Sequence, residues 1–74
     1  MNENTWMQIH TNGASTTFAR FYAGQTDSGQ PIFVFQKMEV DITGGGHAEI
    51  FGEEQYQFAS DAAYRLVAAI KDAQ

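Results

Sequence analysis

The sequence contains no cysteine and only one proline, and its longest uninterrupted apolar run has five residues. The lack of cysteine excludes both a disulfide framework and a cysteine-ligated zinc site. A run of five apolar residues is far shorter than the roughly 20 that a membrane-spanning helix needs. The first residues also lack the basic segment followed by an apolar segment that marks a secretory signal. These absences favour a cytoplasmic protein that is stabilised by packing alone.

Basic residues are also scarce, because four Lys and Arg face nine Asp and Glu, and the net charge is −5. The imbalance is regional: six carboxylates and no Lys or Arg lie between residues 38 and 64. The remaining segments together carry three acids and four bases. Acidity of this kind repels nucleic acid and anionic membranes, and it favours a cationic protein as the partner.

The 74 residues predict a single domain over residues 1–74. A domain of this size buries only about 60% of the surface that its unfolded chain exposes. The hydrophobic share of 43% is ordinary for a globular protein, whereas the aromatic share of 14% is high. Ten large rings are many for so small an interior, so some of them are expected to lie partly on the surface.

The N-terminal residues predict a β-hairpin. Residues 5–11 alternate in polarity, and Asn12-Gly13 follows them. This dipeptide is typical of a type I′ turn, in which both central residues have positive φ. A second strand rich in threonine and aromatic residues is predicted over residues 15–23, and this register places His10 opposite Ser15.

Two further strands follow a turn-rich segment that ends at Pro31. The alternation over residues 32–43 predicts the third strand, and the three glycines at 44–46 predict a tight turn. Residues 47–51 form the predicted fourth strand. Gly52 is expected to kink it, and 55–58 to continue it.

A helix is predicted from an N-cap at Ser60 to about Asp72, with Asp61 and Arg65 as a favourable pair. Because every connection between strands is short, neighbouring strands are expected to pair antiparallel. The predicted fold is therefore an α+β domain. It is a four-stranded antiparallel meander with one C-terminal helix packed on one face, and the other face is left for water or a partner. The expected apolar stripe of the helix comprises Ala63, Leu66, Val67 and Ile70.

The third strand has two different faces, and its aliphatic face is the one assigned to the helix. A three-residue glycine turn would place Asp41 opposite Glu49 and Glu39 opposite Phe51. It would also place Lys37 opposite Glu53. Like charges in direct opposition weaken a sheet by a few tenths of a kcal/mol to about 1 kcal/mol.

The uncovered face is thus predicted to combine carboxylates with phenylalanines, as an interface core with a charged rim does. Because opposed like charges lower the stability of the sheet, a face that carries them indicates a binding surface. The alternative is that these carboxylates are only solvated. The predicted partner-binding residues are Glu39, Asp41, Glu49, Glu53, Phe33, Phe35 and Phe51.

No motif in the sequence predicts catalysis. His47 could approach Asp41 and Glu49 on one face, but neither an HExxH motif nor a second nearby histidine accompanies it. The triple glycine lacks the Lys-Ser/Thr of a phosphate-binding loop. His10 and Ser15 have no orienting carboxylate in the local sequence. We therefore predict a protein that is not an enzyme and that has no cofactor and no metal site.

In size, acidity and lack of catalytic apparatus, the chain resembles the small phage-encoded anti-CRISPR proteins and, more loosely, acidic antitoxins and immunity proteins. The resemblance covers overall character and includes no motif, so no residue role follows from it. It implies a stoichiometric inhibitor in the host cytoplasm, a nucleic-acid mimic whose acidic sheet face blocks the basic nucleic-acid-binding surface of a partner protein. The alternative is a structural or adaptor subunit of a larger assembly, and either a monomer or a homodimer is compatible with the sequence.

Overall fold

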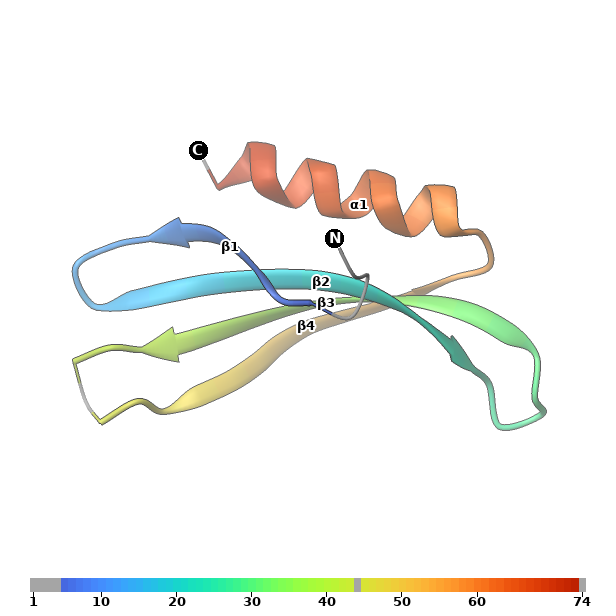
Figure 1. Ribbon diagram of the computed structural model, residues 1–74, viewed down its shortest axis with the longest axis horizontal. Helices are drawn as coiled ribbons and strands as arrows, with labels where there is room; N and C mark the ends of the chain where they lie inside the picture. Colours follow the sequence, from blue (N-terminus) through green and yellow to red (C-terminus); the bar gives the residue numbers. More distant parts are fainter. Residues whose placement is uncertain (1–4, 44, 74) are drawn as a thin grey trace.

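The computed structural model describes residues 5–43 and 45–73, which form one four-stranded sheet and one helix (Figure 1). The strands are antiparallel and lie in the order β1-β2-β3-β4, so the predicted meander with a C-terminal helix is confirmed. The elements are β1 (Met7–Thr11), β2 (Ser15–Gln25), β3 (Pro31–Asp41), β4 (Ala48–Tyr56) and α1 (Ala59–Asp72).

The turn between β1 and β2 differs from the predicted type I′ turn. No non-glycine residue in the described part of the chain has a positive φ, and Gly13 is not among the glycines that do. Instead, the side-chain Oδ1 of Asn12 accepts the backbone N–H groups of Ala14 at 2.8 Å and Ser15 at 2.9 Å. An asparagine at the first position of a turn stabilises it in this way without any left-handed residue.

The connection between β3 and β4 is longer than the predicted three-residue turn. Glu39 pairs with Glu49, and the N–H of Asp41 donates to the carbonyl of His47 at 2.8 Å. The strands therefore part at Asp41, and the register differs by two residues from the prediction. A shift of two preserves which face each side chain occupies, so Glu39 and Glu49 still share a face.

A bulge interrupts the pairing of β3 with β4. Met38 pairs with Ile50 and Lys37 with Gly52, which leaves Phe51 as the extra residue. The kink predicted at Gly52 thus corresponds to this irregularity. Beyond a bulge of one residue, the side chains of the bulged strand change faces relative to its partner.

The helix begins earlier and is rotated relative to the prediction. Its N-cap is Phe58 rather than Ser60, and no side-chain bond caps it. Its buried residues are Ala62 and Ala69, whereas Val67, assigned to the apolar stripe, is 47% exposed. Small alanines approach the sheet because the large side chains that fill the space between the two layers come from the strands.

The helix covers the face of the sheet that carries Phe35, which is the opposite of the predicted face. Phe35 is fully buried, and the guanidinium of Arg65 lies 4.6 Å from the centre of its ring. Ala19 and Ala69 form the core with Phe35, and the half-buried residues that pack against them are Ile9, Tyr56 and Leu66. We call this side of the sheet the covered face and the other side the open face.

The face assignment was wrong because both sides of β3 are apolar where the helix crosses. Phe33 and Phe35 lie on one side, and Ile32 and Val34 on the other. The charged residues that marked the phenylalanine side as polar lie farther along the strand. Figure 1 shows the turns that join β1 to β2 and β3 to β4 extending past the C-terminal end of α1.

The interior is small for a chain with ten aromatic rings. Among the residues described, the buried hydrophobic side chains belong to Ala19, Val34, Phe35, Ala62 and Ala69, and Phe35 is the one large side chain that is fully buried. Several rings lie at the surface, as expected, and within the described part of the chain no helix has the length and apolar character to cross a membrane.

Candidate functional site

A row of polar side chains crosses all four strands on the covered face, beyond the end of α1. His10 pairs with Thr17, Thr17 with Glu39, and Glu39 with Glu49. Directly paired residues share a face, and Thr17 lies two residues before the core residue Ala19, which places the row on the helix side. His10 therefore lies opposite Thr17 rather than Ser15, because the β1–β2 register differs from the prediction.

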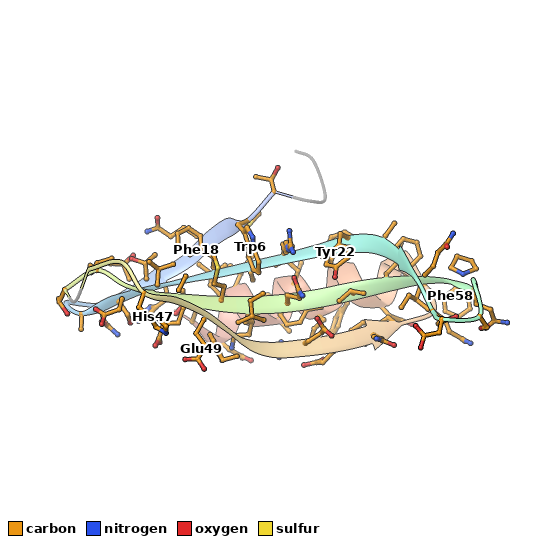
Figure 2. The ribbon with its side chains drawn as sticks, turned by 90° about the horizontal axis from the view of Figure 1, so that it is seen from below. Trp6, Phe18, Tyr22, His47, Glu49 and Phe58 are labelled. Atoms are coloured by element: carbon orange, nitrogen blue, oxygen red, sulfur yellow. The ribbon has the colours of Figure 1, made fainter. Side chains whose placement is uncertain are left out.

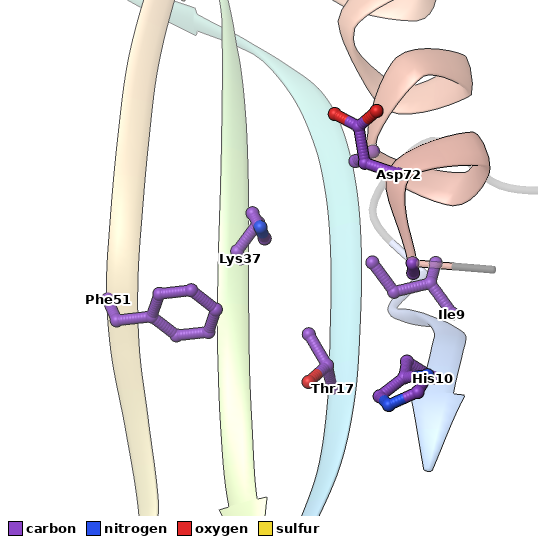
Figure 3. Close-up of a pocket in the computed structure, with 8 residues that line it drawn as sticks. Ile9, His10, Thr17, Lys37, Phe51 and Asp72 are labelled. Atoms are coloured by element: carbon purple, nitrogen blue, oxygen red, sulfur yellow. The ribbon is translucent and has the colours of Figure 1, made fainter.

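A cavity of about 360 Å³ lies where α1 ends above this part of the sheet (Figure 3). Its volume is near the lower end for small-ligand pockets. Figure 3 shows Lys37 and Phe51 on neighbouring strands on one side of the cavity, with Asp72 on the helix opposite them. The lining residues are Ile9, His10, Thr17, Lys37, Phe51, Ala69, Asp72 and Ala73.

The surroundings of the cavity are electronegative. Glu39 and Glu49 are both exposed, and neither side-chain carboxylate makes a hydrogen bond or ion pair with another residue that the structure describes. Asp72 adds a third carboxylate, and the carbonyl end of α1 contributes partial negative charge. Lys37 is the basic residue that lines the cavity, with its Nζ 5.1 Å from the centre of the Phe51 ring, and Lys71 lies in the last turn of α1.

Four of the seven predicted binding residues lie together at this place, and we call them the acidic end: Glu39, Asp41, Glu49 and Phe51. Asp41 occupies the next position on the covered face, opposite Ser15, and its carboxylate accepts hydrogen bonds from the N–H and hydroxyl of Thr43, both at 2.9 Å. The ring of Phe51 is 53% exposed. The acidic end is therefore a surface feature, at the end of the sheet rather than across an uncovered face.

The other three predicted residues lie elsewhere. Phe35 is fully buried beneath α1, and Phe33 is half-buried on the same face. Glu53 pairs with Gln36 and lies on the open face, because the bulge at Phe51 reverses the facing of the residues that follow it. A single acidic and aromatic sheet face, as predicted, does not exist.

Glu54 has a structural role at the other end of α1. It accepts a hydrogen bond from the hydroxyl of Tyr56 and forms an ion pair with Arg65, whose Nε lies 3.1 Å from Oε1 of Glu54. The Tyr56 bond is the main cause that lowers the pKa of Glu54 below its ordinary value, and Arg65 adds to the effect. The same bond raises the pKa of Tyr56. Arg65 thus pairs with Glu54 in place of the predicted Asp61, and it ties the helix to β4.

Sequence reasoning missed four residues of the cavity: His10, Thr17, Lys37 and Asp72. The first three could have been placed by a correct strand register, which depends on two bulges; Gly52 marks the one in β4, whereas the one between Gln8 and His10 has no clear local signal. Asp72 could not, because its approach to the sheet depends on where the helix docks. Figure 2 shows His47 and Glu49 near the glycine-turn end of the sheet.

Within the described ranges, no three His, Cys, Asp or Glu residues are placed to hold a metal ion. Comparisons of the chain with models of protein families, with curated proteins and with solved structures found no match. The chemistry of the acidic end and its cavity is therefore the basis for a functional assignment.

Proposed function

We propose that this protein is a non-enzymatic binding module that attaches to a cationic partner protein through the acidic end. The observation that carries the proposal is the direct opposition of Glu39 and Glu49, both exposed, beside a cavity at the carbonyl end of a helix. Two carboxylates in this arrangement repel each other, and a cation placed between them removes the repulsion.

The shape of the site suits a long basic side chain from the partner. A guanidinium or ammonium group at the mouth of the cavity would meet Glu39 and Glu49, with Asp72 on the helix side. Carboxylates accept charge-assisted hydrogen bonds from arginine, often two in parallel. The exposed ring of Phe51 would add apolar contact, and its face attracts cations, as the position of Lys37 shows.

The charge of the whole chain supports an inhibitory role. A net charge of −5 attracts a basic surface over a distance of about 10 Å at moderate ionic strength. A partner that binds nucleic acid presents Arg and Lys toward phosphates, and carboxylates at the acidic end would occupy the same groups. Such a protein acts by occupying the surface stoichiometrically, so it needs no catalytic residue.

Capture from a cell lysate with three immobilised forms of the chain tests this proposal. The forms are the wild type, the double variant Glu39→Lys/Glu49→Lys, and Asp27→Lys as a control. Asp27 is an exposed acid in the β2–β3 connection, at the opposite end of the sheet from the acidic end.

A partner that fits the proposal binds the wild type and Asp27→Lys, is lost with the double variant, and is released by raised salt. Added duplex DNA should release it as well, if the acidic end occupies a nucleic-acid-binding surface. Equal retention of the same proteins by the double variant would contradict the proposal, because the contact would then not depend on these carboxylates.

A further inference from the structure

The open face of the sheet carries many apolar side chains, and no helix among the described residues covers it, although Thr16, Val34 and Gln36 on this face are buried. Figure 2 views this side, with Trp6, Phe18 and Tyr22 in front of the helix. The strand pairing places Phe18, Met38 and Ile50 side by side in one row, and Tyr22 beside Val34 in another. Phe18, Tyr22 and Met38 are half-buried and Ile50 is 50% exposed, so part of this apolar surface remains in contact with water.

The open face is also electrically balanced, in contrast to the rest of the chain. Among its paired strand residues, the charged ones are Arg20 and Glu53, one of each sign. Gln36 lies between them: its Oε1 accepts from Arg20 Nε at 2.9 Å, and its Nε2 donates to Glu53 at 2.7 Å. The guanidinium of Arg20 also lies 4.3 Å from the ring centre of Trp6. This polar row divides the apolar surface into two areas.

We infer that the open face binds a second copy of this chain, forming a two-sheet sandwich with the helices outside. The interior of one copy is too small for a typical stable domain, since Phe35 is the one large side chain buried completely in the described structure. Chains of this size commonly gain the missing burial by oligomerisation. Two copies would each carry −5, but pairing through the open face leaves the carboxylates of the two acidic ends on the two outer faces of the sandwich.

The size of the face suits such an interface. Strands of 5, 11, 11 and 9 residues, at about 3.3 Å per residue and about 4.8 Å between strands, give a footprint of roughly 600 Å². Because side chains project from the sheet, the solvent-accessible area of the face is larger than this flat projection. Standard interfaces bury about 800 Å² per partner, and stable ones begin near 600 Å². One whole sheet face is therefore just large enough for a dimer interface. A contact over only part of the face would bury too little area.

Symmetry gives the dimer complementary charges. A two-fold axis that runs parallel to β3 exchanges the β2 and β4 sides of the sheet. It therefore places Arg20 of each copy opposite Glu53 of the other, and it places the Phe18, Met38 and Ile50 row opposite itself. The same patch is used on both copies, as closed two-fold assemblies require.

The inference does not depend on the proposed function, because the two surfaces lie on opposite faces of β4. Ile50 and Glu53 belong to the open face, and Glu49 and Phe51 belong to the covered face. A failure of dimerisation would leave the acidic end unaffected, and a failure of partner capture would leave the open face unaffected.

Sedimentation of the full chain tests the second copy directly. We expect a mass twice the 8.2 kDa of one chain, and we expect Ile50→Lys to reduce it to one chain. Ile50 is 50% exposed, so the substitution disturbs the fold of one copy little. Val67→Lys is the control, because Val67 is 47% exposed on the helix, away from the open face. A wild type that remains one chain, or a dimer that resists Ile50→Lys but not Val67→Lys, overturns the inference.

A covalent trap provides a second test that does not depend on disrupting the fold. The chain contains no cysteine, so a single introduced thiol reports one position alone. Met38 lies on β3, close to the proposed axis; because stacked sheets pack about 10 Å apart, which exceeds the reach of a direct disulfide, Met38→Cys should be joined into a dimer by a short thiol-reactive bifunctional cross-linker. Val67→Cys should remain one chain under the same conditions. Equal cross-linking of the two variants would contradict the interface. An absence of cross-linking in Met38→Cys would also contradict it, including the case in which another protein occupies the open face.

Discussion

Glu39 lies directly opposite Glu49 in the antiparallel pairing of β3 and β4, and both side chains are exposed. Like charges at directly opposed positions lower the stability of a sheet. Thr17, on the other side of Glu39, offers a hydroxyl but no positive charge. The protein thus has an unneutralised pair of carboxylates at the edge of its cavity, which is an arrangement suited to a cation from outside.

Replacing Glu49 with lysine should stabilise the fold while it removes partner binding. The new Lys–Glu pair with Glu39 replaces a repulsion with an attraction, and the expected gain is a few tenths of a kcal/mol to about 1 kcal/mol. Urea unfolding measures this gain, with Asp27→Lys as the control for a change in net charge alone. A loss of stability in Glu49→Lys would show that the carboxylate has a structural role.

Phe35 and Phe51 should differ sharply when each is truncated to alanine. Phe35→Ala opens a cavity beneath α1 and should cost about 3–5 kcal/mol in the free energy of unfolding. Phe51 is 53% exposed, and Phe51→Ala should change this free energy by no more than about 0.5–1 kcal/mol. Circular dichroism during urea unfolding measures both, and Phe35→Leu serves as a milder variant that keeps an apolar side chain. Similar costs for the two alanine variants would contradict the position of the helix.

Glu54 should make the stability of the protein depend on pH in the acid range. Its pKa in the folded state lies below its ordinary value of 4.5, so the unfolded chain takes up the proton first. The stabilisation is therefore fully present above about pH 4.5 and is lost as the pH falls through the folded-state pKa. The urea midpoints of the wild type and Glu54→Gln should differ at pH 7 and converge as the pH falls below the folded-state pKa of Glu54. A difference that stays constant across this range would show that the charge of Glu54 contributes nothing.

Gly13 and Gly46 should respond oppositely to alanine. Gly13 has no positive φ, and no atom lies within 4 Å of the position that a Cβ would occupy. Gly13→Ala should therefore be neutral or stabilising by up to about 1 kcal/mol. Gly46 has a φ of 84°, a conformation that costs a residue with a Cβ about 1 kcal/mol or more. Thermal unfolding of the two variants measures the contrast, and a type I′ turn at Asn12-Gly13 would reverse the result for Gly13.

Local sequence patterns determined the order of the elements. The alternation over residues 5–11 and 32–43, the threonine and aromatic content of the second strand, the glycine cluster before β4 and the helical spacing near the C-terminus predict four strands and a helix. Because the connections between strands are short, a meander is the simplest arrangement. The regional acidity is likewise a property of the sequence, and it places carboxylates on β3 and β4 whatever the packing. Three of the seven predicted site residues, Glu39, Asp41 and Glu49, lie together for this reason.

Only the tertiary structure decided which face of the sheet the helix covers. Alternation separates two sets of side chains, but it does not say which set the helix selects when both are apolar. Here the Phe35 ring packs with Ala19 and Ala69 beneath the helix, a fit that depends on the volumes of residues far apart in the chain. The bulge at Phe51 then moved Glu53 to the open face, because one extra residue reverses the facing of those that follow. The site is consequently the end of the covered face, where the helix stops and the strands continue.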